Sequence, residues 1–258
     1  MLSLRSKAEA GHEAIYVPRE AIPYILLQRP ETGRLGALLD NTRVGHLACQ
    51  FHQEVAALKR FYVWYSTKLE ARLRSKAISL TYSKAMKREL QTIWPYLPRC
   101  LGRVLSIGAG VGGLEAHLSS RLSKLCFARP EILLLDKTSV SDVFYGYHES
   151  GSAYNSLAVA GTLLASNGHP SDKLKLLDAE QPPTALPPLD LALSIAAWGF
   201  HFPVSSYLAL VFRSLRPGGI VILDVRKATT GREVLTDTFG NCTTILDERK
   251  FDRVMCER

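Results

Sequence analysis

A short apolar segment followed by closely spaced glycines is the feature of this sequence that most restricts its fold. The apolar run at residues 103–107 leads into four glycines within residues 108–113, and residues 114–125 then have the apolar spacing of a helix. Glycines allow a strand to turn sharply into a helix, and they let the backbone approach a ligand that a Cβ atom would block. Few strand–helix turns that bind no ligand need four glycines in six residues, so we expect a ligand at this turn. The alternative is a tight turn that binds no ligand.

Apolar runs and helical segments alternate along the residues that follow. We expect strands at 131–136, 174–177, 189–195 and 220–225, and helices at 153–167 and 204–215. Because the expected strands are apolar on both faces, they predict a parallel sheet covered by helices on both sides, which is an α/β fold. Residues 243–247 and 253–256 differ from this pattern and predict an antiparallel hairpin that closes one edge of the sheet.

The first hundred residues are mainly helical and basic in their pattern. One helix is expected over residues 47–73, where apolar side chains recur every three or four positions, and a second from a cap at Ser83 to Trp94, before Pro95. Residues 1–100 hold 16 Lys and Arg against 8 Asp and Glu, whereas residues 101–258 hold 16 of each, so the net charge of +8 arises entirely from the first segment. The chain is therefore expected to divide into a basic helical cap or lid over 1–100 and a ligand-binding domain over 101–258.

Composition excludes several other classes of protein. No apolar run approaches the roughly 20 residues that a membrane span needs, and the first ten residues do not have the pattern of a signal peptide. The five cysteines are scattered, without a CxxC pair, and the seven histidines form no HExxH or HxxxH pair, so no metal site is predicted. These features favour a cytoplasmic protein.

The glycine motif by itself fits two kinds of cofactor. Gly108, Gly110 and Gly113 match the GxGxxG fingerprint of dinucleotide-binding domains, whereas Gly108, Gly110 and Gly112 match the GxGxG motif of S-adenosylmethionine-dependent methyltransferases. Asp136 at the end of the second expected strand can accept both ribose hydroxyls of either cofactor. Its alternative role is to cap a following helix.

Two further motifs favour the second cofactor, and with them the sequence resembles class I S-adenosylmethionine-dependent methyltransferases over roughly residues 100–258. The expected strand at 174–177 ends in Asp178-Ala179. A helix ends at Leu215-Arg-Pro-Gly-Gly219 before the next strand, and a NAD-binding domain has no reason to carry this motif at this point. The resemblance implies a Rossmann-like seven-stranded methyltransferase sheet, mostly parallel with a reversed last strand, an N-terminal helical cap, and S-adenosyl-L-methionine as the cofactor. The residues that it implies for cofactor binding are Ser106, Gly108, Ala109, Gly110, Gly112, Asp136, Lys137, Asp178, Ala179 and Ala196.

Ser106 departs from the pattern of this family, which usually has Asp or Glu two residues before the first glycine. A hydroxyl can accept a hydrogen bond from the cofactor's ammonium group, but it cannot form an ion pair with it. Affinity for the methionine part of the cofactor is therefore expected to rest on other groups.

Within the superfamily the sequence is similar to bacterial proteins classed as candidate sugar O-methyltransferases. The similarity is carried by residues 136–138, 144–147, 153–157, 197–203 and 223–226. It implies transfer of a methyl group to a hydroxyl of a sugar or glycan.

The segment after the fourth expected strand, residues 196–203, is where catalysis is expected. His201 has the ordinary pKa that suits a general base, although a loop histidine bonded to the backbone is the alternative. The residues expected to contact the acceptor are Tyr145, Tyr147, Trp198 and Arg226, with His148 as a further candidate. Packing in the core is the commoner role for tyrosine and tryptophan side chains such as these. Asp224 could belong to a divalent-metal site, but the sequence does not indicate the other ligands that such a site needs.

A cationic lid suits an anionic acceptor, such as a nucleotide-sugar, a lipid-linked phosphosugar, an acidic glycan or RNA. Three rival functions remain open from the sequence: an RNA methyltransferase, a NAD-dependent oxidoreductase, and a methyltransferase-like partner protein without activity. No Asn/Asp-Pro-Pro-aromatic motif follows the fourth expected strand, which counts against methylation of a base amino group. The identity of the acceptor and the oligomeric state lie beyond the sequence.

Overall fold

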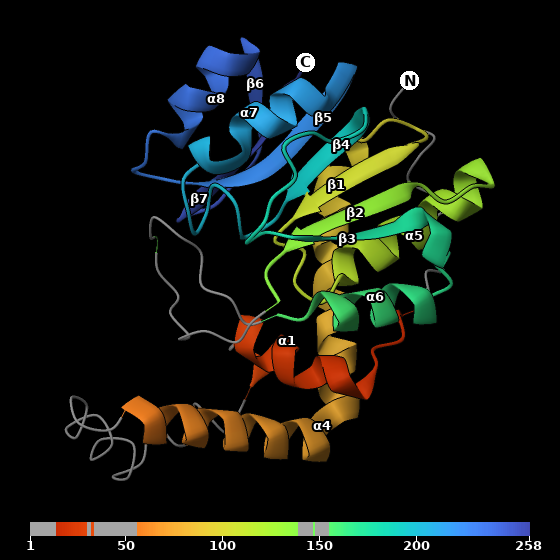
Figure 1. Cartoon of the computed structure of the whole chain (residues 1–258), viewed down its shortest axis with the longest axis vertical. Helices are drawn as coiled ribbons and strands as arrows, with labels where there is room; N and C mark the ends of the chain where they lie inside the picture. The colour runs from red at the N-terminus through yellow and green to blue at the C-terminus, as the bar shows by residue number, and fades with distance from the viewer. Residues whose placement is uncertain (1–13, 30–31, 34–55, 139–146, 148–154) are drawn as a thin grey trace.

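A seven-stranded sheet forms the centre of the protein (Figure 1). A computed structural model of the chain describes residues 14–29, 32–33, 56–138, 147 and 155–258, with the side chains of 56–64 left out. The strands lie in the order β3-β2-β1-β4-β5-β7-β6. Their bounds are β1 Arg103–Ile107, β2 Glu131–Asp136, β3 Leu174–Asp178, β4 Leu189–Ser194, β5 Leu215–Arg226, β6 Cys242–Asp247 and β7 Phe251–Glu257.

The pairing of the strands confirms the predicted sheet. β1 pairs in parallel with β2 and β4, β2 with β3, and β4 with β5, whereas β7 runs antiparallel between β5 and β6. The reversed strand and the terminal hairpin therefore have the predicted arrangement. The fold is the Rossmann-like methyltransferase fold expected from the sequence.

Helices cover both faces of the sheet. Their bounds are α1 Ile22–Gln28, α4 Ala56–Ile93, α5 Gly113–Cys126, α6 Leu157–Ser166, α7 Ser205–Ser214 and α8 Gly231–Phe239, with short 3-10 turns at Arg19–Ala21, Trp94–Tyr96 and Ser171–Lys173. Successive side chains of a strand point to opposite faces, and so Val104 packs with α1, α4, α5 and α6 while Leu105 and Ile107 pack in the cluster beneath α7 and α8. The core on the first face includes apolar residues from both sides of residue 100, so the N-terminal helices share a core with the sheet. The domain boundary at 100/101 stays a prediction.

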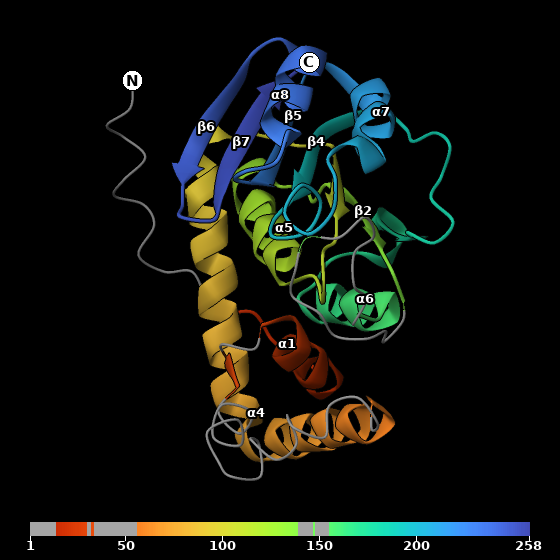
Figure 2. The same ribbon diagram turned by 90° about the vertical axis from the view of Figure 1, so that its left-hand side faces the viewer.

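Helix α4 differs from the two helices predicted for this region. It runs from Ala56 to Ile93 with a break at Arg74, where φ is −121° and ψ is 17°. The two arms point in different directions, and α1 lies between the first arm and the sheet in both views (Figures 1 and 2). The predicted cap at Ser83 is wrong, because Ser83 is buried in the middle of the second arm and its hydroxyl accepts a hydrogen bond from the Ile15 amide at 3.1 Å.

The apolar face predicted on the first arm of α4 is not buried in the described part of the chain. Tyr65, Leu69 and Leu73 are exposed to 64%, 45% and 72%. Their spacing correctly predicts a helix, since the period depends only on local geometry. It does not say what covers the apolar stripe.

Several smaller boundaries also differ. Helix α6 begins at Leu157, after Ser156, whose hydroxyl accepts from the Val159 amide at 3.4 Å, so its predicted start at residue 153 was too early. The strand predicted to begin at Ile220 begins at Leu215 and is irregular opposite Leu189 and Leu191. Helix α8 was not predicted.

The four cysteines among the described residues form two disulfides, which the sequence does not predict. Cys100 pairs with Cys126, and Cys242 pairs with Cys256 across the hairpin of β6 and β7. The spacing along the chain carries no trace of these pairs, because they depend on strand register and on the end of α5. Disulfides are more typical of oxidising compartments than of the cytosol, so the cytoplasmic setting stays a prediction without structural support. Among the described helices, none has the length and apolar character to cross a bilayer.

Candidate functional site

The residues with predicted cofactor roles meet at the carboxyl edge of the parallel strands. The glycine loop follows β1, Asp136 ends β2, and Asp178 ends β3 directly beside Asp136 in the strand register. The amide of Gly108 donates to the Leu135 carbonyl at 2.9 Å, which fastens the start of the loop to the neighbouring strand. Ligands of open parallel sheets bind at this edge, so the fold brings the predicted groups to the expected place.

The glycine loop has a backbone that only glycine adopts without strain. Gly108, Gly110 and Gly112 have φ of +70°, +57° and +79°. A Cβ atom on Gly108 would lie 2.3 Å from the Cβ of Ala197, so the loop also touches the segment that follows β4. Gly112 forms the N-terminal cap of α5, and its amide donates to the carbonyl of Ala109, three residues earlier, at 3.1 Å. Ala109 itself packs against the core.

Asp136 is the carboxylate of this loop. Its Oδ2 atom accepts from the Gly110 amide at 2.9 Å and from the Asn155 side chain at 2.9 Å, and its Oδ1 atom accepts from the Lys137 amide at 2.7 Å. Removal from water raises the pKa of Asp136 to about 6, while these hydrogen bonds and the charge of Lys137 act in the opposite direction. Four lone-pair positions surround a carboxylate, and three are in use, so Asp136 retains room for roughly one further donor.

Asn155 and Gln28 complete this loop, although neither is among the predicted site residues. The buried Asn155 amide donates to the Gly110 carbonyl at 2.7 Å, and its oxygen accepts from Gln28 of α1 at 3.2 Å. A Cβ atom on Gly110 would lie 2.6 Å from the Oε1 atom of Gln28. Helix α1 of the N-terminal region therefore lies directly on the glycine loop.

The end of β3 carries the expected acidic residue in an exposed turn. The Oδ1 atom of Asp178 accepts from the Glu180 amide at 2.9 Å, and the Ala179 amide donates to the Asp136 carbonyl at 3.0 Å. Asp178 and Ala179 thus lie beside Asp136, where the adenine of a bound cofactor is expected, and these roles stay predictions.

The segment after β4 contains one residue whose predicted role is wrong. Trp198, predicted to bind the acceptor, is completely buried between β5 and α7, and its indole nitrogen donates to the Val204 carbonyl at 2.8 Å. Its amide donates to the Ser194 hydroxyl at 2.8 Å. Trp198 is a core residue, because the chain turns back at Gly199 and directs the large ring inward.

His201 and Arg226 lie on the outer side of this turn. The His201 amide donates to the Ala197 carbonyl at 2.8 Å, and its half-buried ring stands edge-on to Phe200 with 4.8 Å between centroids. Arg226 donates from Nε to the Phe200 carbonyl at 2.9 Å and lies over the Phe200 ring at 4.7 Å. Arg226 therefore holds the turn that presents His201, and its predicted contact with the acceptor is untested.

Three other candidates lie in the segment that follows β2. Tyr147 is 38% exposed, whereas Tyr145 and His148 fall outside the described residues. Their predicted contact with the acceptor stays a prediction.

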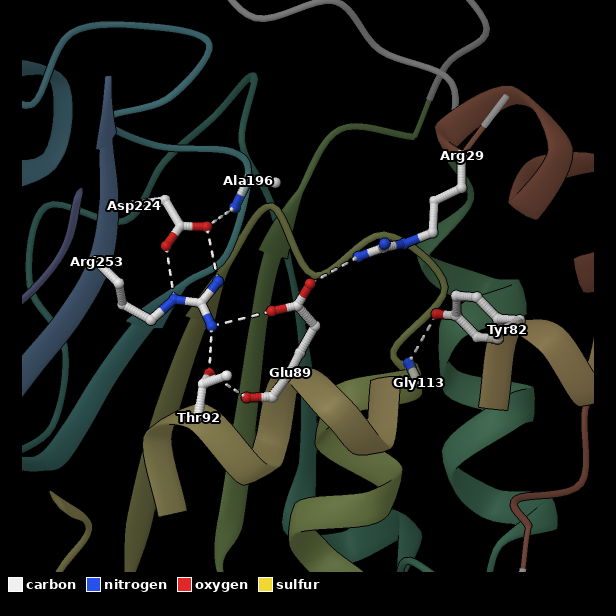
Figure 3. A network of polar contacts seen from close by, with 8 residues as sticks. All are labelled: Arg29, Tyr82, Glu89, Thr92, Gly113, Ala196, Asp224 and Arg253. Atoms are coloured by element: carbon white, nitrogen blue, oxygen red, sulfur yellow. Dashed lines mark hydrogen bonds and ion pairs between the residues drawn. The ribbon is translucent and has the colours of Figure 1, made fainter. Parts of the chain in front are cut away.

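A polar network joins the segment after β4 to the N-terminal helices (Figure 3). Asp224 accepts from the Ala196 amide at 2.9 Å and from Arg253 at 2.6 and 3.0 Å, and Arg253 also donates to Glu89 of α4 at 2.9 Å. Burial raises the pKa of Asp224, and the Arg253 guanidinium opposes that shift. Ala196 has φ of +54°, an uncommon value for alanine. The hydrogen bond from its amide to Asp224 holds this backbone, and its position beside the cofactor stays a prediction.

Ser106 lies beneath the glycine loop with an acidic partner that the sequence did not indicate. Its hydroxyl donates to the Oε1 atom of Glu115, in the first turn of α5, at 2.6 Å. Both residues are buried, to 2% and 1% exposure.

Comparisons with known proteins bear on the fold and leave the function open. No family model and no curated protein matches the sequence. Among solved structures, an O-methyltransferase candidate from Nostoc punctiforme is 15% identical over 72% of this chain and 59% of its own, with a TM-score of 0.50. The T. thermophilus 16S rRNA N2 G1207 methyltransferase, in complex with AdoMet and guanosine, is 18% identical over 69% of this chain and 42% of its own, with a TM-score of 0.44. The O-methyltransferase NovP is 15% identical over 68% of this chain and 78% of its own, with a TM-score of 0.45.

The chain thus spans 42% and 59% of the lengths of the first two of these proteins, and at such identities a likeness speaks to the fold alone. The strand order, the reversed β7 and the likeness to the Nostoc structure lead to one conclusion. The chain has the Rossmann-like fold of class I methyltransferases.

Proposed function

We propose that the protein is an S-adenosylmethionine-dependent methyltransferase. The observation that carries the proposal is the meeting of the left-handed glycine loop, Asp136 and Asp178 at one edge of a sheet with methyltransferase topology. The loop leaves room for backbone to approach a ligand, and Asp136 offers a carboxylate beside it.

The described residues fit this cofactor in three places. Gly108, Gly110 and Gly112 would lie under its methionine part, Asp136 would accept from the ribose hydroxyls, and Asp178 would accept from the adenine amino group. Since Asp136 has room for one further donor, a second ribose hydroxyl requires Asn155 to withdraw its amide from the carboxylate. When bound, the cofactor supplies an electrophilic methyl group.

We further propose that the acceptor atom is oxygen and that His201 removes its proton. Nε2 or Nδ1 of the neutral imidazole would accept the proton of the acceptor hydroxyl, and the T-shaped contact with Phe200 orients the ring. A sugar or glycan is the leading acceptor. Exposed Arg72, Lys76 and Lys84 of α4 suit an anionic one, and the same charges keep an RNA acceptor as the alternative.

A thermal-shift experiment tests the cofactor directly. S-adenosylhomocysteine at about 100 times its Kd should stabilise the protein by roughly 2.7 kcal/mol, which raises Tm by about 5–10 °C for a chain of this size. NAD at the same concentration should leave Tm unchanged. Stabilisation by NAD alone would refute the methyltransferase proposal in favour of an oxidoreductase.

Replacement of His201 tests the catalytic role. His201→Gln removes the base but keeps a polar side chain, and it should lower kcat roughly 10²- to 10⁴-fold. Calorimetry should find the same affinity for S-adenosylhomocysteine, because the imidazole has no part in holding the cofactor. Turnover within threefold of the wild type would remove His201 from the reaction.

A further inference from the structure

The carboxylate of Glu115 is buried beneath the glycine loop with one oxygen unsatisfied. Glu115 is 1% exposed, and its Oε1 atom accepts from the Ser106 hydroxyl at 2.6 Å. Within the described part of the chain no group donates to its Oε2 atom. A buried carboxylate oxygen without a donor is costly, so its retention calls for a partner that the described part of the chain does not supply.

The position of this carboxylate explains the departure at residue 106. The Oγ atom of a serine lies where an aspartate has its Cγ atom, and the oxygens of an aspartate would extend about 1.2 Å farther. The Oε1 atom of Glu115 lies 2.6 Å from Ser106 Oγ, so it stands close to where the oxygens of an acidic residue at 106 would be. Two carboxylates cannot share that space without strong repulsion. The chain therefore carries one acidic group here, on helix α5 instead of strand β1.

We propose that Glu115 is the residue that pairs with the ammonium group of the cofactor's methionine part, and that Ser106 orients its carboxylate for this contact. The inference rests on the proposed function. It assigns to Glu115 the ion pair that Ser106 cannot form, and it assigns to Ser106 a positioning role in place of direct binding.

The charges around Glu115 support the same assignment. Burial, with a smaller contribution from the nearby charge of Asp136, raises the pKa of Glu115 to about 7, so the pocket favours the arrival of a cation. The hydrogen bond from Ser106 acts in the opposite direction and keeps a fraction of the carboxyl ionised at neutral pH. A bound ammonium group would satisfy the Oε2 atom and stabilise the ionised form.

Calorimetry with two ligands separates this contact from the rest of the site. S-adenosylhomocysteine carries the ammonium group, whereas 5′-methylthioadenosine has the same adenosine and sulfur without it. Glu115→Gln keeps the shape and the acceptor for Ser106, and it should weaken S-adenosylhomocysteine binding about 10- to 100-fold, as the loss of one charge-assisted hydrogen bond does. Its affinity for 5′-methylthioadenosine should stay within threefold of the wild type.

Glu233→Gln is the matched control, because Glu233 has the same position in the first turn of α8 that Glu115 has in α5. Glu233 is exposed, and its replacement should change neither affinity. A second variant guards against misfolding of the first: Ser106→Asp combined with Glu115→Ser returns the acid to the strand and should restore the preference for S-adenosylhomocysteine.

The outcomes distinguish this inference from the proposed function. If the wild type binds neither ligand, the methyltransferase proposal itself fails. If the wild type prefers S-adenosylhomocysteine and Glu115→Gln keeps that preference, or loses affinity for both ligands equally, Glu115 does not pair with the ammonium group and only the present inference is overturned.

Discussion

Replacing Asp136 with alanine is expected to weaken the binding of S-adenosylhomocysteine by roughly 10²- to 10⁴-fold. A carboxylate that accepts from two ribose hydroxyls makes two charge-assisted hydrogen bonds, each contributing about 1.5–3 kcal/mol. Asp136 accepts from an amide of the glycine loop itself, whereas Asp178 belongs to an exposed turn on the next strand. Isothermal calorimetry on the purified variant measures the loss.

The same carboxylate also organises the apo loop, and a control must separate the two roles. Alanine would leave the Gly110 amide and the Asn155 side chain without their acceptor. Asp136→Asn keeps an oxygen for one of these donors, so its Tm should stay closer to that of the wild type while the affinity is still lost. Unchanged affinity in a folded Asp136 variant would show that the ribose site lies elsewhere.

The pH dependence of binding gives an independent check. The pKa of Asp136 in the unliganded protein is raised from its ordinary value to about 6, so the group is ionised above that pH and protonated below it. Since the ionised form accepts both hydroxyls, affinity for 5′-methylthioadenosine, which lacks the ammonium group proposed to pair with Glu115, should be constant above pH 7 and should fall as the pH drops through 6. The Asp136→Asn variant should lack this dependence between pH 5 and 7.

The parts of the site that follow from local sequence could be predicted, and those that depend on distant contacts could not. The glycine loop, Asp136 and Asp178 follow from strands that end in turn and acidic residues, because parallel strands end at one edge of a sheet. Gln28 donates to Asn155, which lies 127 residues away in the sequence, and no periodicity predicts such a contact. The contact between Glu115 and Ser106 could not be predicted for the same reason. It depends on how helix α5 packs against strand β1, which the local sequence does not show.

Similar reasoning explains the errors in the fold. The spacing of Trp198 within an aromatic loop gave no direction for its ring, which the turn at Gly199 decides. The break of α4 at Arg74 comes within a sequence of good helix formers, so local helix propensity does not predict it. Local patterns therefore predicted the elements of the protein, whereas tertiary packing decided which side chains they buried.

The largest loss of stability is expected from replacing Arg253, which joins the terminal hairpin to α4 and to the segment after β4 (Figure 3). The side chains of Arg253 and Asp224 are each 1% exposed, so Arg253→Met leaves a buried carboxylate without its cation. Breaking such a pair costs about 3–5 kcal/mol in the free energy of unfolding, measurable by urea denaturation. Arg216→Met is the matched control: Arg216 pairs with Asp190 at 2.7 Å but is 53% exposed, and its loss should cost about 0–1 kcal/mol.

Adding Asp224→Asn to Arg253→Met should recover part of that loss, because a neutral amide no longer leaves a buried charge without a partner. Recovery should be incomplete, since Glu89 and Thr92 keep polar groups that faced Arg253. The single variant should also lower turnover, because Asp224 holds the Ala196 amide in the segment that presents His201. A loss below about 1 kcal/mol for Arg253→Met would mean that water replaces the guanidinium, and the network would then position the loop without stabilising the fold.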